Sequence, residues 1–276
     1  MPKMHFNRLH LNVTENQRKD VFIIDGIRSE ASAGFNDYSY KIVDVTTYEN
    51  YIKGYLIKYD PYGRGEVLDE STGTVKRGGT VNNIVGKAFF IINTAEMIIA
   101  FEEIKNLISK TMFERMFINL FKINHQGKAF EFFISTISEK YSFIEKVRNL
   151  HNINRVSIML VPSNPNNADL WRDTDERMQE NRITKYKEVQ ESSTNEGIII
   201  DEETIAKMAM SEDGYGVATA QGKDEEGNPM TITTTSKRQE ITQVLPENIE
   251  RGSFQEIINY LSRTFERIKS RTNHQE

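Results

Sequence analysis

One stretch, residues 213–236, constrains the fold of this chain more than any other feature. A tyrosine between two glycines at 214–216 opens an alternating run, a turn with two glycines and a proline follows at 222–229, and a threonine-rich run closes the stretch. Glycine and proline between two extended runs are typical of a β-hairpin. The stretch therefore predicts a hairpin whose exposed faces could meet a nucleic-acid backbone, a base or another protein.

Length and composition limit the class of protein. The chain has 276 residues, 38% of them apolar and 27% charged, which is enough for one large domain or two smaller ones. Its net charge of −5 argues against indiscriminate coating of DNA but leaves room for a local basic groove. The chain has no cysteine, which excludes disulfides, thiolate zinc sites, iron–sulfur clusters and cysteine nucleophiles.

The sequence shows no segment for secretion or membrane insertion. The N-terminal residues lack the apolar core of a secretory signal. The longest apolar stretches, near 88–92 and 97–101, are far shorter than the roughly 20 residues of a membrane helix. We expect a soluble cytoplasmic protein with no membrane attachment and no cofactor.

Hydrophobic periodicity gives a coarse order of elements. Alternating residues rich in Tyr, Ile and Val predict strands through residues 5–92, including a short one at 21–27. Residues 93–123 are predicted as the clearest helix, because apolar residues recur at three- and four-residue steps from Met97 to Leu120. The strand–helix–strand–helix–strand order over 86–161 predicts a mixed sheet with packed helices.

A proline pair at 162–165 forces a bend after this unit. A charged helix at 169–190, the hairpin and an amphipathic helix at 254–269 follow. The predicted fold class is α+β, with N-terminal antiparallel strands, a mixed sheet with packed helices, and a C-terminal hairpin and helix. Two parts are predicted, which could pack as one domain: a mixed α+β core at 1–165, and a helical brace, hairpin and C-terminal helix at 166–276.

No complete catalytic set is found in the sequence. No two of the five histidines have the four-residue spacing that places both on one metal, so no metal site is predicted. A metal-dependent nuclease brings two carboxylates and a lysine to one phosphate, and Asp25 and Glu131 are the candidates. Asp25 precedes a glycine, where a turn is the more common role. Arg267 and His274 resemble the arginine–histidine pair of HEPN-type ribonucleases, although those domains are all-helical.

Basic residues near the hairpin predict contact with nucleic acid. Two cations directly follow the threonine run, and the terminal helix carries more, so together they could neutralise phosphates. The tyrosine of the hairpin could stack on a base. The alternatives are a solvated helix and a core tyrosine. The predicted nucleic-acid-binding residues are Tyr215, Lys237, Arg238, Arg263, Arg267 and Lys269.

Short motifs carry a resemblance to a family. The strand Leu9-His10-Leu11 and the segments 162–165, 214–216 and 222–227 resemble an uncharacterised bacterial family of mobile-element and phage-defence loci. The resemblance covers most of the chain and brings no catalytic residue with it. The first strand and the late glycine-rich turn are also similar to the RAMP proteins of CRISPR systems, which bind RNA, but their repeated glycine-rich loop is missing here.

These observations favour a non-enzymatic component of a bacterial defence or mobile-element system that binds RNA, DNA or a protein partner. A nuclease effector, either metal-dependent or HEPN-like, is one alternative. A structural assembly subunit, pairing with a partner or with its own copies through the charged helix at 169–190, is the other.

Overall fold

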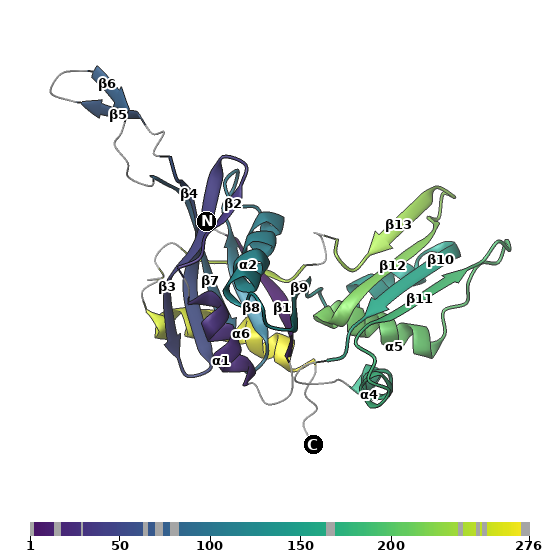
Figure 1. The fold of residues 1–276 in the computed structure, drawn as a ribbon. Helices are drawn as coiled ribbons and strands as arrows, with labels where there is room; N and C mark the ends of the chain where they lie inside the picture. The colour runs from purple at the N-terminus through teal and green to yellow at the C-terminus, as the bar shows by residue number, and fades with distance from the viewer. Residues whose placement is uncertain are drawn as a thin grey trace.

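Two large antiparallel sheets organise the chain, with helices packed on them (Figure 1). The computed structural model describes residues 3–13, 18–28, 30–62, 66–69, 74–77, 83–163, 169–236, 240–246, 249 and 253–271. The predicted α+β class is confirmed. Every strand pair within these ranges is antiparallel, where a mixed sheet was expected over residues 86–161.

The first sheet is built mostly from the N-terminal half of the chain. Its strands are β1 Lys3–Val13, β2 Ala33–Phe35, β3 Tyr38–Tyr48, β4 Tyr51–Asp60, β7 Asn83–Asn93, β8 Ile98–Glu103, β9 Phe130–Thr136 and β14 Thr242–Val244. They run in the order β14-β1-β8-β7-β4-β3-β2, and β9 pairs with the second half of β1. β5 Glu66–Asp69 and β6 Thr74–Arg77 form a separate hairpin.

Helices cover both faces of the first sheet, which explains its continuous apolar strands. The helices are α1 Lys19–Ile27, α2 Lys110–Asn124 and α6 Phe254–Lys269. Phe90 and Phe101 belong to the core shared with α1 and α2, whereas Phe89 and Ile98 belong to the core shared with α6. Neighbouring residues over 88–92 of β7 and 98–101 of β8 therefore point into different cores and are all buried.

The second sheet has one covered face and one open face. Its elements are α3 Ser142–Arg148, β10 His151–Leu160, the 3-10 turn η1 Asp169–Trp171, α4 Arg172–Glu180, β11 Tyr186–Glu191, α5 Glu202–Met210, the π-helical turn η2 Ser211–Tyr215, β12 Gly216–Lys223 and β13 Pro229–Thr233. The strand order is β11-β10-β12-β13. α3, α4 and α5 pack their apolar residues on one face. Ser157, Thr219 and Thr233 occupy partly exposed positions across the other face.

The turn η2 fastens the second sheet to β1 of the first. Arg8 Nε donates to the Asp213 carbonyl oxygen at 2.9 Å, and its Nη1 donates to the Glu96 carbonyl oxygen at 3.1 Å. His10 Nε2 lies 2.8 Å from the Gly214 carbonyl oxygen. Burial lowers the pKa of His10 to about 3, so the ring is neutral and this nitrogen carries the donated proton.

The helix predicted over 93–123 is wrong in its first half. Residues 98–103 form β8, and α2 begins only after Ser109, whose side chain accepts a hydrogen bond from the Met112 amide. The side chain of Asn93 caps the turn at 94–97, between β7 and β8, by accepting hydrogen bonds from the amides of Ala95 and Glu96. A strand buried on both faces has no alternation, so its apolar residues also fit a helical period.

Two shorter elements also differ from their predictions. Residues 21–27, predicted as a strand, lie in α1, where Gly26 packs so closely on α2 that a Cβ there would lie 2.3 Å from the Phe121 ring. The charged helix predicted over 169–190 ends at Glu180, and the edge strand β11 follows. Charged side chains on an edge strand such as β11 discourage another chain from pairing with it.

The division into residues 1–165 and 166–276 stays a prediction. Strand pairs cross it, since β10 pairs with β11 and β12, and β1 pairs with β14. Among the described residues, no helix has the length and apolar character needed to cross a membrane.

Candidate functional site

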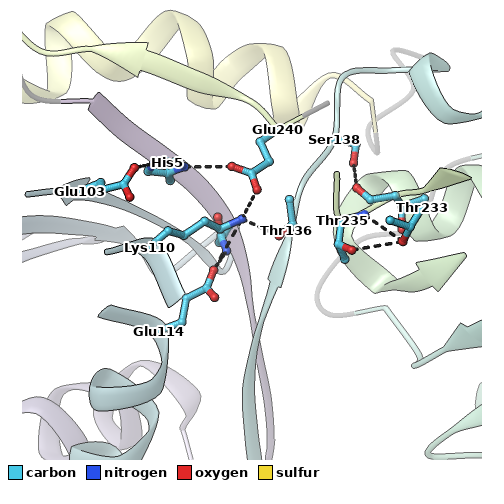
Figure 2. Close-up of polar contacts among 11 residues, drawn as sticks. His5, Glu103, Lys110, Glu114, Thr136, Ser138, Thr233, Thr235 and Glu240 are labelled. Carbon is cyan, nitrogen blue, oxygen red and sulfur yellow. Dashed lines mark hydrogen bonds and ion pairs between the residues drawn. The ribbon is translucent and has the colours of Figure 1, made fainter. Parts of the chain in front are cut away.

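A cavity of about 330 Å³ lies between the two sheets. One wall is formed by α2, β9 and the end of β8, and the other by Val217 of β12 and by Thr235 just beyond β13. Figure 2 shows the polar side chains that surround it, with the threonines of the second sheet on one side and the charged residues of the first on the other. The cavity is therefore a cleft between the two sheets.

A hydrogen-bonded network of charged residues forms the first-sheet side of this cleft (Figure 2). His5 Nδ1 lies 3.1 Å from Glu240 Oε2, and His5 Nε2 lies 3.2 Å from Glu103 Oε2. Lys110 Nζ donates to Glu240 Oε1 at 2.7 Å and to Thr136 Oγ1 at 2.8 Å. The network joins β1, β8, α2 and β9 to residue 240, which the chain order alone keeps far apart.

The charges of the network are unequally available to a ligand. Burial alone raises the pKa of Glu240, but hydrogen bonds from His5 and Lys110 outweigh it and lower that pKa to about 2. Burial raises the pKa of Glu114, although Lys110 at 3.8 Å and a hydrogen bond from Asn7 oppose the rise. The side chain of Glu240 is 5% exposed, against 22% for Glu114 and 34% for Glu103. In the described part of the cleft lining, the more exposed charges are therefore carboxylates.

Glu240→Gln is expected to remove a pH-dependent part of the stability. The folded-state pKa of Glu240, about 2, lies below its ordinary value of 4.5. Its contribution is therefore present above the ordinary pKa and is lost as the pH falls toward the folded-state value. We expect the variant to lose roughly 1–2 kcal/mol of unfolding free energy at neutral pH and much less near pH 3. Urea unfolding of both proteins measures the difference, and a difference that stays constant with pH contradicts this role.

The second-sheet side of the cleft includes Thr235, which lies two residues after the end of the edge strand β13. The Thr234 amide donates to the Ala218 carbonyl oxygen at 3.0 Å, and the Ala218 amide donates to Thr234 Oγ1 at 3.1 Å. Ser138 Oγ donates to the Thr234 carbonyl oxygen at 2.6 Å (Figure 2). The end of β13 is thus tied both to its own sheet and to the segment that follows β9.

The structure does not bring the predicted catalytic residues together. Asp25 is exposed on α1, not at a strand end. Glu131 lies within β9, as expected, and lines a different cavity of about 320 Å³ with Lys19 and Arg182, without Asp25. Within the described ranges, no group of three His, Asp or Glu side chains is arranged to hold a metal ion. Arg267 pairs with Glu139 at 3.1 Å, and His274 lies outside the described residues.

The predicted nucleic-acid-binding residues are also dispersed. Tyr215 is 0% exposed, and it packs on Trp171 and beneath Arg8, so the expected stacking on a base has no open ring face. Lys269 lies 3.3 Å from Glu96, and Arg267 pairs with Glu139 as described above. Arg263 is exposed on α6. Lys237 and Arg238 lie outside the described residues.

The charged network beside the cleft was missed by sequence reasoning. His5 and Glu240 are 235 positions apart, so no local spacing reveals their contact. The available signal was the alternation of Lys3, His5 and Asn7 with Met4 and Phe6 in the first half of β1, which places the polar side chains on one face. That signal becomes informative only once both faces of β1 are known to be covered.

Comparison with known proteins gives a family but no relative of known activity. The family model described as "Domain of unknown function (DUF4747)" matches residues 7–262. This span includes both sheets and most of α6, while His5 lies just before it. The search of curated proteins finds no match.

Proposed function

We propose that this chain, which belongs to the DUF4747 family, is a non-enzymatic binding protein that holds an extended segment of a protein partner in the cleft between its two sheets. The observation that carries the proposal is the uncharged edge of β13 beside a cleft whose more exposed charges, in its described lining, are carboxylates. A peptide strand added to such an edge gains main-chain hydrogen bonds, and pockets for its side chains supply selectivity.

The edge of β13 has backbone groups directed away from its own sheet. In an antiparallel pair, hydrogen-bonded and non-hydrogen-bonded residue pairs alternate. Thr234 is hydrogen-bonded to Ala218, so by the same register Ile232 is bonded to Ala220. The amide and carbonyl of Thr231 then point outward. Among the described residues, no further strand pairs with β13 on this side.

The opposite edge of this sheet differs in a way that supports the proposal. β11 places Lys187 and Glu191 on the open face, and such charges discourage the addition of a further strand. β13 carries no charge, and its Met230 is 41% exposed. The edge that borders the cleft is therefore the better of the two for pairing with another chain.

Charge favours a polypeptide over a nucleic acid in this cleft. Among the described residues that line the cleft, Glu103 and Glu114 are the partly exposed charges, whereas Lys110 is held by Glu240. A phosphate backbone would meet two carboxylates here, and like charges repel. A peptide with a lysine or arginine placed opposite them would be attracted.

The sequence-based hypothesis also included a biological setting and two alternative functions, and the proposal retains them. A setting in a bacterial defence or mobile-element system is supported by the motif resemblance at 162–165 and 222–227. An assembly of identical copies is the closest alternative, because a second β13 could occupy the same edge. The nuclease alternative has the least support, since the cavity that Glu131 lines does not include Asp25.

Thr231→Pro is expected to weaken partner binding while leaving the fold intact. Proline removes the outward amide, and it is tolerated on an edge strand when that amide faces away from the sheet. The binding assay uses an array of nine-residue peptides of alternating β-branched residues, with and without a central lysine. We expect the lysine peptides to bind, and T231P to weaken them roughly tenfold or more.

Thr231→Ala is the matched control, because it removes the hydroxyl and keeps the amide. It should bind as the unchanged protein does, and thermal melts should show both variants folded. Equal binding by T231P, or binding of single-stranded RNA in preference to every peptide, would overturn the proposal. A dimer in sedimentation that dissociates in T231P would instead identify a second copy as the occupant.

A further inference from the structure

A second cavity, of about 410 Å³, lies at the other side of the junction between the sheets. It is formed by the start of α3, by η1, by η2 and by the residues after α6. The residues that matter to the inference are Lys140, Tyr141, Trp171, Glu212, Asp213 and Arg271. None of them lines the cleft described above.

Glu212 is a buried carboxylate, and one of its two oxygens lacks a hydrogen-bond partner among the described residues. The residue is 2% exposed and lines the cavity. Its Oε1 accepts from the Phe143 amide at 2.5 Å and from Ser142 Oγ at 3.4 Å. Its Oε2 is buried and has no hydrogen-bond partner among the described residues. A buried polar atom without a partner is costly, so a site that keeps one is a candidate for a ligand.

The neighbouring carboxylate, Asp213, is compensated by the protein itself. Trp171 Nε1 donates to Asp213 Oδ2 at 2.9 Å, and Arg271 Nη1 lies 3.8 Å from Asp213 Oδ1. Arg271 is further engaged, because it donates to the Ser138 carbonyl oxygen at 2.6 Å. Glu212 is therefore the acidic group at this cavity that lacks a close cation within the described part of the chain.

The backbone around the cavity is unusual on both sides. Glu212 and Asp213 lie in a π-helical turn, a conformation that is frequent at functional sites. Tyr141 has a φ of 61°, which is uncommon for a residue other than glycine and has an energetic cost. Both features belong to segments that line this cavity.

We propose that this cavity binds a small organic cation, with a primary amine or guanidinium group donating to the Glu212 carboxylate beside Trp171. A hydrogen bond between a carboxylate and a cation is stronger than one between neutral groups. Lys140 is exposed at the rim, and its Nζ lies 5.1 Å from the centre of the Tyr141 ring, so the ligand is recognised by the Glu212 carboxylate and not by that ring. The site is independent of partner binding at β13.

The charge on Glu212 makes this binding pH-dependent. Burial and the neighbouring Asp213 raise the pKa of Glu212 to about 7, against the hydrogen bonds from Phe143 and Ser142 and the charge of Arg271. A cation binds the ionised form, so affinity rises with pH up to this pKa and falls by about tenfold per pH unit below it. The other charged groups that face the site are Lys140 before α3, Asp169 of η1, Glu139, and Arg8 of β1 through Asp213.

Calorimetric titration with methylguanidinium tests the site, and methylurea, which has nearly the same shape and no charge, is its control. We expect saturable binding of methylguanidinium at about pH 8, roughly tenfold weaker binding at about pH 6, and no binding of methylurea. Glu212→Gln keeps an oxygen for Phe143 and removes the charge. It should weaken binding by about tenfold and abolish the pH dependence.

Leu170→Arg is a second variant in case Glu212→Gln does not fold. Leu170 lines the cavity and is 45% exposed, so a cation there should block the ligand without disturbing the core. Thermal melts verify that each variant is folded. The inference is overturned if methylurea binds as well as methylguanidinium, if inorganic phosphate binds instead, if neither variant weakens binding, or if no cation gives a saturable signal.

Discussion

Gly216→Ala is expected to destabilise the protein by about 3 kcal/mol or more. A Cβ at this position would lie 2.0 Å from the Met159 carbonyl oxygen and 3.0 Å from Leu160 Cδ2. The backbone conformation of Gly216 does not exclude alanine, because its φ of 163° is extended backbone. The obstacle is the close approach of β12 to β10, whose backbone cannot withdraw because β11 holds it from the other side.

Gly34→Ala provides the comparison for this result. Among the described residues other than its two chain neighbours, none has an atom within 4 Å of a Cβ built on Gly34, so the same substitution should change the unfolding free energy by less than about 0.5 kcal/mol. Urea unfolding of both variants, followed by far-UV circular dichroism, measures the two effects. Equal destabilisation would show that the approach of β12 to β10 relaxes at little cost.

The terminal helix shows what the sequence could predict well. An amphipathic helix was expected at 254–269, and α6 spans Phe254–Lys269. Ile257, Leu261 and Phe265 of its apolar face are buried against the first sheet, on the face opposite α2. One buried face and one solvated face give a clear helical period, and the side chain of Ser253 caps the first turn.

Residues 93–123 show where the same reasoning fails. Ile98, Ile99, Ala100 and Phe101 are all 0% exposed, because β8 is covered by α2 on one face and by α6 on the other. Alternation disappears in such a strand, and only length and flanking residues separate it from a helix. The element type was therefore decided by packing partners that are distant in sequence.

The hairpin at 213–236 was predicted in outline and differs at its start. β12 and β13 pair as expected, with residues 219–223 opposite 229–233. Residues 211–215 form a π-helical turn instead of an arm of the hairpin, and Tyr215 is the buried end of that turn. Gly214 has a φ of 88°, a conformation that glycine adopts easily. The glycine–tyrosine–glycine motif at 214–216 therefore lies at the junction between the sheets and not on an exposed face.

Arg8→Met is expected to destabilise the protein by roughly 3 kcal/mol. Arg8 is 2% exposed, and its guanidinium lies 4.5 Å from the centre of the Tyr215 ring. Methionine fills part of the same volume but leaves the carbonyl oxygens of Asp213 and Glu96 without this donor. It also removes a positive charge that lowers the otherwise raised pKa of Asp213, so the carboxylate is less well compensated.

Arg155→Met separates this effect from the general loss of an arginine. Arg155 pairs with Glu191 on the open face of the second sheet, where the two side chains are 44% and 63% exposed, so its loss should cost about 0.5 kcal/mol or less. Hydrogen exchange then shows where Arg8 acts. If Arg8 fastens η2 to β1, the amides of β10 and β12 should exchange faster in R8M while those of β7 and β8 change less, because the core of the first sheet does not depend on η2. A uniform increase across both sheets would mean that the two unfold as one unit and that the Arg8 contacts stabilise the whole molecule.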